Sequence, residues 1–141
     1  MKGILATAAL AALAALVLAA PAAASTDPAA ALRLGLAWRN GIGRAADPAE
    51  ARRCLQEAAK GGEPAAMFVL AHMLADGEGG PPDAVAAHAW LQEAAEHDYP
   101  EALQELALGE PDPQRADALM RAAAHALAHR AHAARDALNR E

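Results

Sequence analysis

The chain repeats itself with a period of 36 residues, which constrains its fold more than any other feature of the sequence. Residues 28–63 align with residues 64–99 without a gap, and 13 positions are identical. The run Leu55–Ala59 returns unchanged as Leu91–Ala95. A unit of this length cannot bury its apolar face alone, so we expect the copies to stack side by side around a continuous core.

Each copy has the start and stop signals of a first helix. Prolines stand at the expected first helical position at Pro28, Pro64 and Pro100, where the missing N–H loses no hydrogen bond. Gly41 and Gly77 are typical of helix ends, because glycine adopts the left-handed conformation that closes the last turn. Apolar and small residues recur at helical spacing between these signals.

A second helix follows a short turn in each copy. Asp47 and Asp83 are predicted N-caps, since a carboxylate accepts hydrogen bonds from the N–H groups of the first turn. The helical patterns then run to about residues 60 and 97. We therefore predict an all-α fold, a short right-handed α-solenoid of helix-turn-helix repeats, with about two and a half to three repeats.

Small, apolar and capping residues recur at fixed offsets in the two copies. In the first copy they are Ala30, Leu34, Gly35, Trp38, Gly41, Gly43, Asp47, Ala51, Ala58, Ala59 and Gly61. In the second copy they are Ala66, Leu70, Gly77, Gly79, Asp83, Ala87, Trp90, Ala94 and Ala95. This set resembles the Sel-one-like repeat, a short α-solenoid unit related to the tetratricopeptide repeat, although Cys54 stands where the motif has tryptophan.

The resemblance implies a repeat domain over residues 25–141, with repeat one at 28–63 and repeat two at 64–99. Residues 100–141 form a degenerate third copy, because Pro100 is in register but the Gly-x-Gly turn is missing. Terminal repeats of such arrays are usually atypical, since one of their faces meets solvent. We expect this third copy to act as a cap.

Residues 1–24 have the pattern of a bacterial signal peptide. Lys2 precedes an apolar stretch, and Ala22 and Ala24 provide the small residues that processing before Ser25 requires. An uncleaved membrane anchor is the alternative, but the apolar stretch is short and rich in alanine. We predict export to the periplasm, with no membrane contact after cleavage.

Charge and composition limit the partners and the chemistry. The formal net charge is −6, from 12 basic and 18 acidic side chains, which disfavours nucleic acid as a partner. Cys54 is the only cysteine, so an internal disulfide is excluded, and we predict that it is a small buried side chain. Ser25 is the only serine, and no nucleophile–base arrangement is evident. We predict neither enzymatic activity nor a cofactor.

Three histidines near the C-terminus fall on one side of a predicted helix. His125, His129 and His132 are spaced by four and three residues, which can bring imidazoles together around a transition metal. Arginines rather than carboxylates lie between them, so a solvated polar face is the favoured interpretation. A metal-binding protein is retained as an alternative function.

The first helices supply the candidate binding surface. In tetratricopeptide-like solenoids these helices line the concave face, where peptides and proteins bind. With Leu34 at the packed centre of the first helix, the opposite stripe consists of Leu32, Leu36, Arg39, Phe68, His72 and Leu108. The same residues can instead pack against neighbouring helices, and both interpretations stay open.

The family resemblance favours a non-catalytic adaptor or scaffold that binds another protein or peptide in the bacterial envelope. It also implies a rival function, because envelope hydrolases have been described among cysteine-rich relatives. The single Cys54 has no second cysteine to pair with, which counts against that rival.

Overall fold

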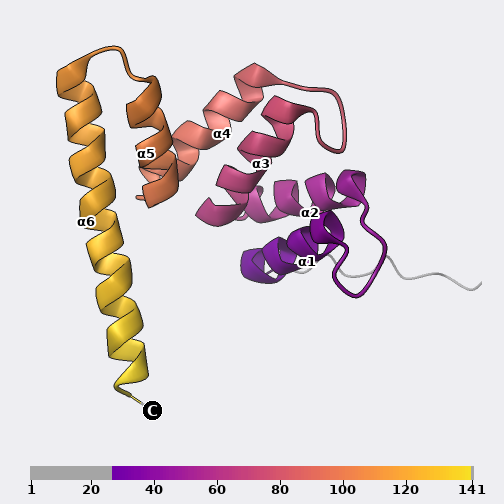
Figure 1. Cartoon of the computed structure of the whole chain (residues 1–141). Coiled ribbons are helices and arrows are strands. Elements are labelled where there is room, and N and C mark those ends of the chain that lie inside the picture. Colours follow the sequence, from indigo (N-terminus) through magenta and orange to yellow (C-terminus); the bar gives the residue numbers. More distant parts are fainter. Residues whose placement is uncertain (1–26, 141) are drawn as a thin grey trace, which may run out of the picture.

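Six helices and no strand make up residues 27–140, the part of the chain that the computed structural model describes. They are α1 Pro28–Asn40, α2 Pro48–Lys60, α3 Pro64–Asp76, α4 Ala84–Glu96, α5 Pro100–Gly109 and α6 Pro113–Leu138. Consecutive helices form three pairs that stack in chain order (Figure 1). The predicted all-α solenoid is confirmed, whereas the predicted signal peptide, residues 1–24, lies outside the described residues.

The helix ends use the capping residues that the sequence indicates. The carboxylate of Asp27 accepts a hydrogen bond from the N–H of Ala29 at 3.0 Å, and Asp47 caps α2 in the same way. Gly41 and Gly77, which follow α1 and α3, have φ values of 68° and 69°. Both glycines therefore adopt the predicted left-handed conformation, which ends the helix and lets the chain turn back.

The core lies between the stacked helices and consists mostly of alanine and leucine. Leu55, Leu70 and Met73 are among its largest fully buried side chains. Cys54 is 2% exposed, which confirms the buried side chain predicted at this position. Burial raises the pKa of the Cys54 thiol, because the thiolate is the form that loses most solvation. This thiol is therefore poorly suited to act as a nucleophile.

One expectation about the core is wrong. Leu34, placed at the packed centre of α1, is 38% exposed, whereas the equivalent Leu70 of α3 is 1% exposed. Leu70 belongs to a core cluster that also includes residues of α1 and α2, whereas within residues 27–140 no helix pair precedes α1. The residues that α1 buries are Ala31 and Gly35. Gly35 lies against α2, where an added Cβ would come within 2.7 Å of the Cγ atom of Leu55.

The turn after α3 fits closely onto the first repeat. An added Cβ at Gly79 would collide with the carbonyl group of Pro48, at the start of α2. The guanidinium of Arg52 donates two hydrogen bonds of 3.1 Å to the carbonyl oxygen of Pro81 in the same turn. Backbone contact and side-chain hydrogen bonds thus fix how repeat two sits on repeat one.

The third helix pair is unequal, because α5 has 10 residues and α6 has 26. Ala123 is buried in the first half of α6, but Leu127 is 40% exposed and Leu138 is 74% exposed. The second half of α6 extends past the N-terminal end of α5, because the two helices are antiparallel (Figure 1). Among the described helices, none has both the length and the apolar character that a bilayer crossing requires.

Candidate functional site

Two of the six predicted groove residues meet on α3. The ring centroids of Phe68 and His72 lie 4.7 Å apart in an edge-to-face arrangement, and the ring of Tyr99 lies 5.4 Å from that of Phe68. The Nε2 atom of His72 is 3.0 Å from a carboxylate oxygen of Glu105 on α5. Phe68 packs against the core on one side and is partly open to solvent. Phe68 therefore has features of both interpretations: it packs against neighbouring helices, and part of its ring is accessible to a ligand.

The other four predicted residues are placed differently. Arg39 donates hydrogen bonds of 2.8 to 3.1 Å to both carboxylate oxygens of Glu78, in the turn after α3. These bonds raise the pKa of the Arg39 guanidinium and tie α1 to the second repeat. Leu32 and Leu36 are half-buried on α1, and Leu108 is 81% exposed near the end of α5. The main contact of Arg39 is thus an ion pair that joins the first repeat to the second.

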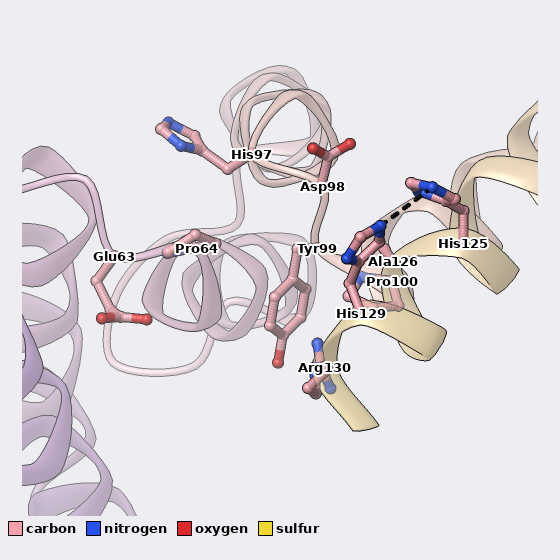
Figure 2. A pocket seen from close by; sticks show the side chains of 10 residues that line it. All are labelled: Glu63, Pro64, His97, Asp98, Tyr99, Pro100, His125, Ala126, His129 and Arg130. Atoms are coloured by element: carbon pink, nitrogen blue, oxygen red, sulfur yellow. Dashed lines mark hydrogen bonds between the residues drawn. The ribbon is translucent and has the colours of Figure 1, made fainter. Parts of the chain in front are cut away.

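A pocket of about 730 Å³ lies beside Tyr99, between the start of α3, the connection from α4 to α5, and the middle of α6 (Figure 2). Its lining residues are Glu63, Pro64, His97, Asp98, Tyr99, Pro100, His125, Ala126, His129 and Arg130. We call it the Tyr99 pocket. Because three separate elements build its walls, its shape depends on how the second and third helix pairs stack.

An ion pair forms the charged edge of the Tyr99 pocket. Arg130 donates hydrogen bonds of 2.8 and 3.0 Å to the two carboxylate oxygens of Glu101, and its guanidinium carbon lies 5.2 Å from the centroid of the Tyr99 ring. The hydrogen bond from Arg130 lowers the pKa of the Glu101 carboxyl. Burial raises the pKa of Tyr99, and the negative charge of Glu101 adds to the rise. At neutral pH the pocket presents an uncharged phenol beside a paired guanidinium.

Tyr99 and Arg130 are site residues that the sequence reasoning missed. Asp27 and Glu63 occupy the positions equivalent to Tyr99 in the first two repeats, and each side chain accepts a hydrogen bond that caps the next helix. Tyr99 makes no such capping bond, so an aromatic residue at a capping position was the available signal. Arg130 offered no signal, because its partner Glu101 is 29 residues away in the sequence.

The structure brings together two of the three C-terminal histidines. The Nε2 atoms of His125 and His129 lie 3.2 Å apart on an exposed part of α6. His132 points its Nδ1 atom instead toward Asp136, at 4.0 Å from a carboxylate oxygen. In the part of the chain that the structure describes, no group of three or more histidine, cysteine or acidic side chains has an arrangement that could hold a metal ion.

Known proteins share the repeat and the helical stack. The model of the Sel1 (Sel-one-like) repeat matches residues 28–63 and 64–99. A crystal structure of a Sel1 repeat protein from Oxalobacter formigenes has a TM-score of 0.64, is 28% identical and covers 68% of this chain. A protective antigen present in uropathogenic Escherichia coli strains, which displays an SLR fold, has a TM-score of 0.64, is 30% identical and covers 72%. The chain spans 41% and 23% of the lengths of these two proteins. No curated protein matches the chain.

Proposed function

Because the chain belongs to the Sel1 repeat family, we propose that it is a non-catalytic module that binds another protein or peptide in the bacterial envelope. Sel1 repeats generally act as protein–protein interaction modules, and proteins built from them are typically non-catalytic scaffolds. The envelope assignment rests on the signal-peptide pattern of residues 1–24.

The observation that carries the proposal is the aromatic pair of Phe68 and Tyr99, in which Tyr99 lines the Tyr99 pocket and Phe68 lies beside it on α3. The two rings are 5.4 Å apart, and both are partly open to solvent. Phe68 belongs to α3 and Tyr99 precedes α5, so a ligand that contacts both spans two successive helix pairs. Large planar side chains supply much of the binding energy at protein interfaces. Such a surface suits a peptide segment with an aromatic or apolar anchor.

Polar groups flank the aromatic pair and favour a peptide over a purely apolar ligand. The ring of His72 meets that of Phe68 in an edge-to-face arrangement, and Arg130 lies over the ring of Tyr99. Both side chains carry N–H groups, which suit the carbonyl groups of a bound peptide. The pocket volume of about 730 Å³ is large enough for several side chains.

Affinity capture tests the proposed surface. Mature protein is immobilised, envelope extract is passed over it, and retained proteins are identified by mass spectrometry. Phe68→Ala and Tyr99→Ala should each weaken retention of the partner about tenfold or more, because each removes a planar anchor. Val85→Ala is the matched control, since Val85 is 83% exposed on α4 and belongs neither to the aromatic pair nor to the pocket lining.

Circular dichroism of the same variants separates binding from folding. A loss of about 3–5 kcal/mol of stability in Phe68→Ala would assign that residue to the core, and Tyr99→Ala would then carry the test. Unchanged retention in both variants with helicity intact would contradict the proposed surface. Equal loss in Val85→Ala would show that retention does not depend on the aromatic pair.

Intact mass tests the envelope assignment. Protein recovered from the periplasmic fraction should begin at or near Ser25, because Ala22 and Ala24 meet the small-residue requirement for signal processing. The cytoplasmic fraction of the same cells is the control. Protein that keeps Met1 in the membrane fraction would replace the exported module with an anchored one.

A further inference from the structure

We propose that His125 and His129 form a two-ligand site for a divalent transition-metal ion on α6, in addition to the protein-binding role proposed above. Their Nε2 atoms lie 3.2 Å apart, and their ring centroids are 4.4 Å apart with an angle of 65° between the planes. Figure 2 shows the two nitrogen atoms facing each other at the Tyr99 pocket. Two imidazole nitrogens of one helix thus lie close enough to bind one ion.

The separation of these nitrogen atoms fits one metal ion. Imidazole nitrogens bind zinc at about 2.0–2.1 Å, so two of them 3.2 Å apart subtend an angle of about 100–105° at the ion. This angle lies between the octahedral and the tetrahedral values. Two histidines four residues apart on a helix also hold zinc in the H-E-x-x-H metalloproteases. The ion therefore fits without movement of the helix backbone.

The contact between the rings of His125 and His129 holds the two ligands close together before a metal ion binds. In the absence of metal, one Nε2–H donates a hydrogen bond to the lone pair of the other Nε2 atom. On metal binding this proton moves to the Nδ1 atom of the same ring, and rotation of the two rings turns both Nε2 lone pairs toward the ion. Because the hydrogen bond already holds the rings close together, binding orders little beyond this rotation.

The charges around the pair are mixed, because Arg135 lies on one side of the two histidines and the Tyr99 pocket lies on the other. Arg130 lines the same pocket, but its guanidinium is paired with the carboxylate of Glu101. Glu63 and Asp98 contribute carboxylates to the pocket lining. The pocket side of the pair thus offers balanced charge rather than an uncompensated arginine.

The ligand chemistry selects the class of metal. Imidazole suits Cu²⁺, Ni²⁺ and Zn²⁺, whereas Mg²⁺ and Ca²⁺ prefer oxygen ligands. The affinity of nitrogen ligands rises to Cu²⁺ in the first-row series, so we expect Cu²⁺ to bind most tightly. Two protein ligands leave the other coordination positions open to water or to a ligand in the Tyr99 pocket.

Isothermal titration calorimetry of untagged, metal-free mature protein tests the site with Cu²⁺, Ni²⁺, Zn²⁺ and Mg²⁺. We expect one Ni²⁺ or Zn²⁺ ion per chain, tighter binding of Cu²⁺, and no heat of binding with Mg²⁺. His129→Gln should weaken Ni²⁺ binding by at least about tenfold, because it removes one of two direct ligands. The matched control is His88→Gln, which removes an exposed histidine from α4 and should leave the affinity unchanged.

Two further outcomes decide the assignment. His132→Gln distinguishes a pair from a cluster: unchanged affinity supports the pair of His125 and His129, and a loss equal to that of His129→Gln overturns it. Absence of Ni²⁺ and Zn²⁺ binding, or equal weakening by His88→Gln and His129→Gln, overturns the site altogether. Circular dichroism of each variant verifies that α6 remains helical.

Discussion

The first and second repeats carry the same leucine at the same point of their first helices, but only the second repeat buries it. Leu34 is 38% exposed and Leu70 is 1% exposed. The turns show the same contrast. An added Cβ at Gly43 would meet nothing within 4 Å, whereas one at Gly79 would collide with the carbonyl group of Pro48 in the first repeat.

This difference separates two kinds of contact within one repeat pattern. Some repeated residues close the helix pair of their own repeat, as Gly35 does against Leu55. Others lie where the preceding repeat is close: Gly79 lies against Pro48, and Leu70 is buried in a core that includes residues of the first repeat. Their counterparts at the start of the described stack, Gly43 and Leu34, are open or exposed. The pattern therefore predicts the role of a residue within the unit, while its burial depends on the position of the unit in the array.

The two leucines give the largest expected difference. Leu70→Ala should lower the free energy of unfolding by about 2–5 kcal/mol, because it leaves a cavity in the core. Leu34→Ala should lower it by about 1 kcal/mol or less, since that side chain already meets water. Denaturant unfolding followed by circular dichroism measures both. Equal losses would show that Leu34 is covered in solution and would remove the contrast between the repeats.

The helix pairs could be predicted because their signals are local. Pro28 and Pro64 mark where α1 and α3 begin, and Gly41 and Gly77 mark where they end. The exposure of Leu34 could not be predicted in this way, because a repeat motif describes an average unit with a neighbour on each side. The first described repeat has a neighbour on one side only, so the exposure of its residues differs from that of the average unit.

The candidate site was predictable only within single helices. Phe68 and His72 are four residues apart on α3, and this spacing alone brings their side chains together. The contact of Arg130 with Tyr99 depends on where α6 passes the start of α5, which the short turn at residues 110–112 determines. The place where two helices cross depends on the packing between them, and no periodic pattern in the sequence indicates it.

Gly43 and Gly79, at equivalent positions of the two turns, provide a second comparison between the repeats. The expected difference in the free energy of unfolding is smaller than for the two leucines. Gly43 has φ 72° and Gly79 has φ 76°, so both lie in the left-handed region. Alanine at either position should therefore lower stability by about 1–2 kcal/mol through backbone strain. Because this strain is nearly the same at both positions, it cancels when the two variants are compared.

Gly79→Ala should lower the free energy of unfolding by about 1–3 kcal/mol more than Gly43→Ala, because its Cβ overpacks against Pro48. The obstacle is a backbone carbonyl, which cannot rotate away as a flexible side chain can. Denaturant midpoints at equal slopes measure this excess, which reports how tightly the second repeat sits on the first. Equal losses would mean that the turn lifts away from α2 in solution. A larger loss for Gly43→Ala would mean that the first repeat has a covering neighbour there, and the contrast between the repeats would then be reversed.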